Sequence, residues 1–98
     1  MTFNELIQSE KPVLVDFFAT WCGPCQMMVP LLNEVKHEIG DIASIVKVDI
    51  DKNQHAANAY QVLSVPTFIL FKRGKVLWRQ SGAVPKKGLI EAIKKFCA

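Results

Sequence analysis

Two cysteines separated by two residues, in the run Trp21-Cys22-Gly23-Pro24-Cys25, are the residues best suited to do chemistry in this chain. The apolar segment from Val13 to Phe18 precedes them and predicts a buried strand, whereas Gln26 to Glu38 has the pattern of a helix. Cys22 therefore falls at or near a helix N-terminus, where free backbone N–H groups and the helix dipole favour a thiolate over a thiol. The thiolate is the nucleophile, and a second thiol on the first helical turn can attack the first. The pair predicts a dithiol–disulfide exchange centre.

A zinc site and a structural disulfide are the two other interpretations of this cysteine pair. A structural zinc site needs four ligands, but the sequence has no second cysteine pair, His37 and His55 lie far apart, and Cys97 stands alone. A disulfide between such close neighbours closes a very short loop and constrains the unfolded chain little. The strand before the pair and the helix after it favour the redox interpretation.

Length and composition indicate one domain, residues 1–98, that can build its own core, since half of its residues are hydrophobic. The net charge of +3 is modest, and the densest basic cluster, Lys72-Arg73-Gly74-Lys75, falls on a predicted hairpin turn. A nucleic-acid site would need a basic stripe with interleaved aromatic residues. No apolar run has the length of a membrane span, and Met1 to Glu5 lacks a signal-peptide pattern. We therefore expect a cytoplasmic protein, in a compartment that keeps thiols reduced, with neither nucleic acid nor membrane as partner.

The elements that must position the cysteines begin with a short helix that ends near Gln8, because Thr2 and Glu5 match a capping box. The helix after the cysteines carries an apolar stripe at helical spacing, formed by Met27, Met28, Leu31, Leu32, Val35 and Ile39. A strand over Ile42 to Ile50 follows. The order strand, helix, strand predicts a parallel β-α-β unit with a right-handed crossover.

The second half of the chain predicts a helix over Gln54 to Tyr60, capped by Asn53, and then a hairpin of strands over Thr67 to Phe71 and Lys75 to Gln80. A last helix over Lys86 to Cys97 has an apolar side made of Leu89, Ile90, Ile93, Phe96 and Cys97. These elements predict an α/β fold with a mixed sheet of at least four strands and helices on both faces.

Two charged residues interrupt the apolar strands. A carboxylate in a buried strand is costly unless it is paired or protonated. Asp16 is therefore either solvent-facing or a buried carboxyl with a raised pKa, which could accept and return protons next to the cysteines. Lys47 is either an exposed lysine or a partner near Asp16 that tunes its proton affinity.

The chain resembles the thioredoxin family over nearly its whole length, at Trp21-Cys22-Gly23-Pro24-Cys25, at Val65-Pro66-Thr67 and at Gly82-Ala83, in that order. The resemblance implies the thioredoxin fold, a central mixed four- to five-stranded sheet flanked by helices on both faces. The leading strand would be short or absent, so the strand around Ile45 is expected at a sheet edge. The implied activity is that of a protein-disulfide reductase, a monomeric electron carrier without metal or cofactor. Its partners would be thioredoxin reductase and disulfide-containing substrate proteins.

The resemblance also implies roles for the matching residues. Cys22 would be the exposed nucleophile, Cys25 the buried resolving thiol, and Asp16 the proton acceptor for Cys25 through water. The redox potential would be tuned by Gly23, Pro24 and Lys47. Pro66 would be a cis-proline facing the disulfide, and an extended substrate segment would bind in a groove formed by Trp21, Val65, Pro66, Gly82 and Ala83.

Some residues depart from the family pattern. Gln26 and Met28 replace residues that are often basic, so the surface beside the cysteines is expected to be more apolar. An apolar groove near Trp21, Met28 and Val65 motivates a second hypothesis, a thioredoxin-fold subunit or chaperone that docks on one partner. A secreted oxidant or isomerase is a third, disfavoured because such relatives usually carry a His between the cysteines. Cys97 is either a core-facing residue or a regulatory or dimer-forming thiol.

Overall fold

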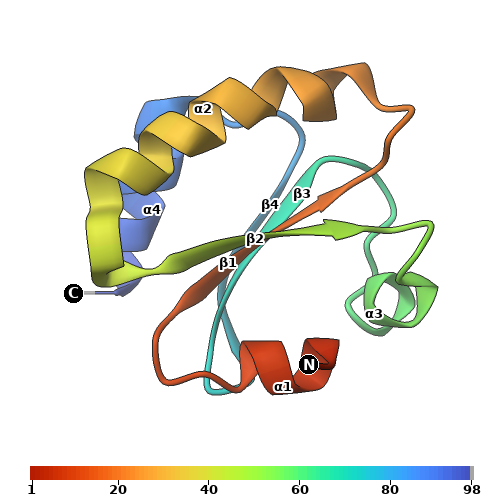
Figure 1. Cartoon of the computed structure of the whole chain (residues 1–98), viewed down its shortest axis with the longest axis horizontal. Helices are drawn as coiled ribbons and strands as arrows, with labels where there is room; N and C mark the ends of the chain where they lie inside the picture. The colour runs from red at the N-terminus through yellow and green to blue at the C-terminus, as the bar shows by residue number, and fades with distance from the viewer. Residues whose placement is uncertain (98) are drawn as a thin grey trace.

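The computed structural model describes residues 1–97, which form a four-stranded sheet with helices on both faces (Figure 1). The elements follow in the order α1 (Phe3–Ile7), β1 (Val13–Phe18), α2 (Gly23–Ile39), the 3₁₀ turn η1 (Gly40–Ile42), β2 (Ser44–Asp49), α3 (Gln54–Ala59), β3 (Thr67–Lys72), β4 (Lys75–Ser81) and α4 (Lys86–Phe96). Every helix and strand expected from the sequence is present. Within residues 1–97 no helix combines the length and the apolarity needed to cross a membrane.

The sheet has the strand order β2-β1-β3-β4 and is mixed, as expected. β1 runs parallel to β2 and antiparallel to β3, and β3 pairs antiparallel with β4. The β1-α2-β2 segment is thus the expected parallel unit, and β2 lies at an edge of the sheet. β1 is a central strand with both faces covered, which explains its nearly unbroken apolar sequence.

Two apolar clusters bury the two faces of the sheet. On one face α2 and α4 pack on the sheet through Leu14, Met28, Leu32, Val35, Ile39, Phe68, Leu70, Leu89, Ile90 and Ile93. On the other face α1 and α3 pack through Ile7, Val13, Val15, Phe17, Val48, Ala56, Ile69 and Phe71. Figure 1 shows this arrangement, with α2 and α4 together on one side of the strands and α1 and α3 on the other.

Three details of the expected helices and strands are wrong. β2 begins at Ser44 rather than Ile42, because Gly40–Ile42 forms a 3₁₀ turn after α2. Met27 is 75% exposed and does not belong to the apolar stripe of α2. Successive helical residues point about 100° apart, so burial of Met28 turns its neighbour toward solvent. Phe96, 37% exposed, lies at the border of the apolar side of α4.

Of the two predicted helix caps, one is confirmed and the other is wrong. The capping box of α1 is confirmed, since the Glu5 N–H donates to Thr2 Oγ1 at 3.1 Å and the Thr2 N–H donates to Glu5 Oε1 at 3.3 Å. Asn53 stands at the N-cap position of α3, but its side chain makes no cap bond to the helix. Instead its amide donates to the Asp49 carbonyl at 3.0 Å, so it braces the end of β2.

Cys97, at the end of α4, is half-buried and packs against the α2–α4 cluster. Burial raises the pKa of its thiol, partly opposed by the positive charge of Lys72. A higher pKa leaves less thiolate and therefore a less reactive thiol. These observations favour the core-facing interpretation of Cys97 over the regulatory one.

Candidate active site

Cys22 and Cys25 form a disulfide at the N-terminus of α2, with their Cα atoms 5.3 Å apart. Cys22 is the N-cap residue of the helix, and its Sγ accepts a hydrogen bond from the Cys25 N–H at 3.2 Å. Gly23 and Pro24 occupy the first helical positions, where the missing N–H of proline removes no helix hydrogen bond. After reduction, the same N–H and the helix dipole would stabilise a thiolate at Cys22.

Cys22 is more covered than expected, whereas Cys25 is buried as the resemblance implies. Cys22 is 5% exposed and Cys25 2% exposed, so the expectation of an exposed nucleophile is wrong for this disulfide form. The two cysteines form a small apolar cluster with Ala19, against which Val65 packs. Cys22 Sγ lies 3.7 Å from the Val65 carbonyl oxygen, which comes from a segment 43 residues away. The sequence near the cysteines contains no signal for this cover.

The Val65–Pro66 peptide bond is cis, as the resemblance implies. Three contacts hold the segment around it. The Gly82 N–H donates to the Pro66 carbonyl at 2.7 Å, and Thr67 Oγ1 donates to the Ser64 carbonyl at 2.7 Å. Thr67 Oγ1 also lies 3.1 Å from the hydroxyl of Ser81. The structure thus brings Val65 to Cys22 and Gly82 to Pro66, and the exposed Ala83 follows Gly82.

Trp21 lies beside the disulfide with 69% of its surface exposed. Its indole N–H donates to Asp51 Oδ2 at 3.0 Å, and the Asp51 N–H donates to Asp49 Oδ1 at 2.8 Å. The loop after β2 therefore anchors the indole while most of the residue's surface stays in solvent. Sequence reasoning missed Asp51, because a polar residue in a loop 30 positions away carries no local sign of this contact.

The apolar surface beside the cysteines differs from the one expected. Met28 is 2% exposed and belongs to the core, so it does not contribute to a surface groove. Met27, one turn after Gly23 on α2, is exposed instead, and Leu63, two residues before Val65, is 93% exposed. Of the residues expected to form an apolar groove, Trp21 is exposed but Met28 is not, and the exposed Met27 and Leu63 were not expected there.

Asp16 is fully buried in β1, so the solvent-facing alternative is wrong. Neither carboxylate oxygen has a hydrogen-bond partner among residues 1–97. Alternation along the strand places Asp16 on the same face as Leu14, which packs with Met28 under the first half of α2. Burial raises the pKa of Asp16 from 3.8 to about 6, partly opposed by the positive charge of Lys47. A carboxyl that titrates near neutral pH suits a group that must accept and return a proton.

Lys47 is the β2 residue directly opposite Asp16 in the parallel register. It is exposed, and its Nζ lies 4.6 Å from the centroid of the Phe18 ring. No ion pair joins it to Asp16 in the described part of the chain, but its charge lowers the pKa of that carboxyl. Both interpretations of Lys47 therefore hold, since it is exposed and also acts on Asp16 through space.

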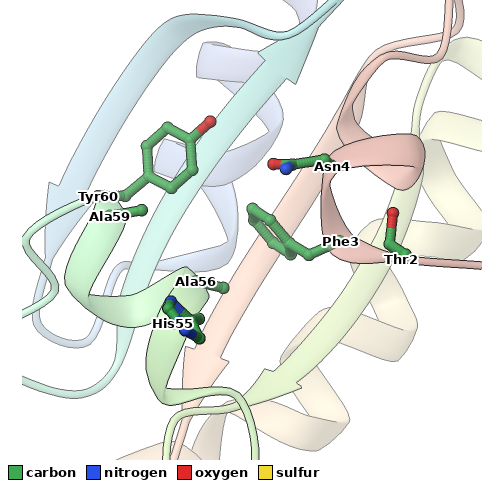
Figure 2. Close-up of a pocket in the computed structure, with 7 residues that line it drawn as sticks. All are labelled: Thr2, Phe3, Asn4, His55, Ala56, Ala59 and Tyr60. Atoms are coloured by element: carbon green, nitrogen blue, oxygen red, sulfur yellow. The ribbon is translucent and has the colours of Figure 1, made fainter.

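A hollow of about 320 Å³ lies between α1 and α3, away from the cysteines (Figure 2). Its lining consists of Thr2, Phe3, Asn4, His55, Ala56, Ala59 and Tyr60. None of these is a residue that the sequence predicts for the site. Beside the disulfide, the apolar side chain of Trp21 is exposed, which suits contact with a protein segment.

Three features define a class of small α/β domains with a cysteine pair poised for thiol–disulfide exchange: a disulfide on the first turn of a helix, a cis-proline beside it, and a buried carboxyl in the preceding strand. The family model described as Thioredoxin matches residues 1–95. This chain belongs to the thioredoxin family.

Individual relatives agree with that assignment. The chain is 55% identical over 94 residues to Thioredoxin Y2, chloroplastic, of Arabidopsis thaliana, covering 95% of this chain and 56% of the relative. It is 47% identical over 87 residues to thioredoxin of Bacillus subtilis, covering 89% of this chain and 84% of that protein. A solved mutant thioredoxin from Halobacterium salinarum matches with a TM-score of 0.87 at 36% identity, covering 97% of this chain and 82% of that one. The chain therefore spans about half the length of the Arabidopsis relative.

Proposed function

We propose that this chain is a protein-disulfide reductase that carries electrons by reversible oxidation of the Cys22–Cys25 dithiol. The observation that carries the proposal is the position of this disulfide at the N-terminus of α2, with the Val65 carbonyl against Cys22 Sγ. The dithiol is itself the redox group, so the reaction needs no bound cofactor.

The reaction has two exchange steps. The Cys22 thiolate attacks one sulfur of a substrate disulfide, forms a mixed disulfide and releases the other substrate sulfur as a thiolate. Cys25 then attacks Cys22 Sγ, which forms the Cys22–Cys25 disulfide and releases the second substrate thiolate. Two electrons pass to the substrate, and both substrate thiolates are protonated.

Each step needs a different thiol to be activated at a different time. The Cys25 N–H, which donates to Cys22 Sγ at 3.2 Å, and the helix dipole stabilise the Cys22 thiolate before substrate binds. Cys25 is buried, which favours its protonated form until a base takes the proton. The Asp16 carboxylate, with its pKa near 6, is the proposed base, acting through a bridging water.

Regeneration requires an electron donor, because each cycle leaves the chain oxidised. We assign this role to a thioredoxin reductase and the acceptor role to disulfide-containing substrate proteins. A cytoplasmic location is part of the proposal, because a reductase works where thiols are kept reduced. The Arabidopsis relative is named chloroplastic, so fluorescence imaging of the tagged full-length protein is the experiment that separates these compartments.

The reduction potential of the Cys22–Cys25 pair tests the direction of electron flow. The protein is equilibrated with dithiol–disulfide buffers of defined potential, and the oxidised fraction is measured. We expect a value near the roughly −270 mV typical of thioredoxins, at which the pair donates electrons to most partners. A value near the roughly −120 mV of strong periplasmic oxidants would refute both the reductase activity and the cytoplasmic location.

Cysteine variants test the two exchange steps. Cys22→Ser should abolish reduction of protein disulfides, because no thiolate remains to attack. Cys25→Ser should accumulate mixed disulfides with substrate proteins, visible by non-reducing electrophoresis, because the second step is lost. Full activity of Cys22→Ser would contradict the mechanism.

A docking role is the second candidate, favoured by the exposed side chains of Trp21, Met27 and Leu63 near the disulfide. Large exposed apolar side chains gathered in one region are typical of protein-binding surfaces. A partner complex whose affinity is the same with Cys22→Ser, Cys25→Ser and the unchanged chain would support docking without redox chemistry. Binding that is lost with Cys22→Ser would support the reductase instead.

A further inference from the structure

We propose that Arg79 is a positioning residue for the segment Gln61–Pro66, which carries Val65 to the disulfide; this inference rests on the proposed reductase function. Arg79 lies on β4, and its side chain is exposed. One guanidinium nitrogen, Nη1, donates to the Tyr60 carbonyl, and the other, Nη2, donates to the Gln61 carbonyl at 2.7 Å. A single side chain thus holds two successive carbonyls where the segment begins.

These carbonyls lack helix partners because of how α3 ends. Gln61 has a φ of 52°, a left-handed conformation that glycine usually occupies at this position. Its N–H donates to the Asn58 carbonyl at 3.1 Å, and the Val62 N–H donates to the Ala57 carbonyl at 2.9 Å. This pair of bonds is a Schellman motif, which satisfies the carbonyls of the last helical turn. The carbonyls of Tyr60 and Gln61 lie beyond it, and the guanidinium fork, with its fixed pair of donors, matches two neighbouring acceptors.

The middle of the segment has little packing of its own. Leu63 is 93% exposed and Ser64 is also exposed, whereas Val65 at its end packs against the cysteines. The placement of Val65 therefore depends on how the two ends of the segment are held.

Residues at the end of β4, together with Gly82 directly after it, contact both ends of the segment Gln61–Pro66. At the far end, the Ser81 hydroxyl lies 3.1 Å from Thr67 Oγ1, and the Gly82 N–H donates to the Pro66 carbonyl at 2.7 Å. At the near end, the side chain of Arg79 is the contact that β4 provides. Without it, the near end would keep the turn at Gln61 and the packing of Tyr60 and Val62 on the core, but it would lose its hydrogen bonds to β4. The Val65 backbone would then meet a substrate in a wider range of positions.

The test compares Arg79→Gln with a matched control, Arg73→Gln. Arg73 lies in the turn of the same hairpin and carries the same charge, but its guanidinium contacts Glu10, at 3.4 Å. Reduction is measured with dithiothreitol as electron donor and two oxidants, the protein disulfides of insulin and the small disulfide cystine. Cystine is too short to occupy an extended groove, so it reports on the cysteines alone.

We expect Arg79→Gln to raise KM for insulin about fivefold, the scale of one ordinary hydrogen bond, because the segment is loosened rather than lost. The kcat should stay within about twofold. Its rate with cystine and its reduction potential should match those of the unchanged chain. Arg79→Lys should raise KM for insulin less than Arg79→Gln does, because the lysine ammonium can reach one of the two carbonyls. Arg73→Gln should change none of these quantities.

Two kinetic outcomes would overturn the proposal. One is an unchanged KM for insulin in Arg79→Gln. The other is an equal loss with insulin and cystine, which would assign Arg79 to general stability.

Hydrogen exchange of the Val62 amide separates this inference from the proposed function. We expect about tenfold faster exchange in Arg79→Gln and no change in Arg73→Gln, because the Val62 N–H lies in the motif that Arg79 covers. If the unchanged chain reduces no disulfide, the reductase function is wrong, and this exchange still tests whether Arg79 holds the segment. Unchanged exchange in Arg79→Gln would refute the positioning role whatever the activity.

Discussion

Replacing Asp16 with Asn should make the stability of the protein less dependent on pH. The carboxyl is fully buried and its oxygens have no hydrogen-bond partner within residues 1–97, so ionisation in the folded state is costly. Asn has nearly the same shape and cannot ionise. The variant therefore removes the cost of the charge while leaving the packing under α2 nearly unchanged.

The size of the effect follows from the pKa shift. In the unfolded chain Asp16 loses its proton near its ordinary pKa of 3.8, whereas burial in the folded state raises the pKa to about 6. Between these values the folded state binds more protons than the unfolded state, so the stability of the unchanged chain falls as pH rises through this window. The pKa shift of about two units, at about 1.4 kcal/mol for each unit, lowers the free energy of unfolding by about 3 kcal/mol. This loss of stability is complete above about pH 7.

The assay is urea unfolding of the oxidised protein at pH 4 and at pH 8, since in the disulfide Cys22 and Cys25 do not titrate. The free energy of unfolding of Asp16→Asn, relative to the unchanged chain, should rise by about 2–3 kcal/mol from pH 4 to pH 8. Comparing two pH values cancels any constant cost of burying the amide.

The control for this assay is Asp41→Asn. Asp41 is exposed and lies 3.8 Å from Lys11 in a surface ion pair, which should contribute little at either pH. A difference between Asp16→Asn and the unchanged chain that stays constant within about 0.5 kcal/mol would refute the buried, high-pKa carboxyl.

The remaining predictions concern neighbouring contacts. Lys47→Met should raise the pKa of Asp16 further, because the lysine charge lowers it; NMR titration of the carboxyl carbon checks this, and an unchanged pKa would contradict it. Met28→Ala should cost about 2–5 kcal/mol in urea unfolding because the side chain is buried. The matched Met27→Ala, at an exposed position, should stay within about 0.5 kcal/mol, and equal losses would show that the helix face is wrongly assigned. Gly74→Ala should lower the free energy of unfolding by about 1–2 kcal/mol, since Gly74 has a φ of 78° and a Cβ would meet the side chain of Gln8. Unchanged stability in the same unfolding assay would contradict this prediction.

Much of the fold could be predicted from the sequence because the relevant signals are local. The apolar run Val13 to Phe18, the capping box at Thr2 and Glu5, and the turn at Arg73 and Gly74 each act over a few residues. Cys22 could be placed at a helix start for the same reason. The motif resemblance added what no local pattern predicts, such as the cis bond before Pro66.

The failed predictions that bear on the site concern which side chains are covered in the fold. Met27 and Met28 are chemically identical neighbours, and only the packing of α2 on the sheet decides that Met28 is the buried one. Cys22 is covered by Val65, which the fold brings from 43 residues away. Local spacing carries no information about such coverage.

The sequence by itself determined the order of the elements, the cysteine pair at a helix start and the family, since these depend on residue types and short spacings. The tertiary structure alone decided the environment of each reacting group. The pKa of Asp16 is raised only because the fold buries its carboxyl away from bulk solvent. The contacts of Trp21 with Asp51 and of Arg79 with the end of α3 likewise join residues remote in sequence. Desolvation and long-range contacts are properties of the folded packing, which a linear pattern does not contain.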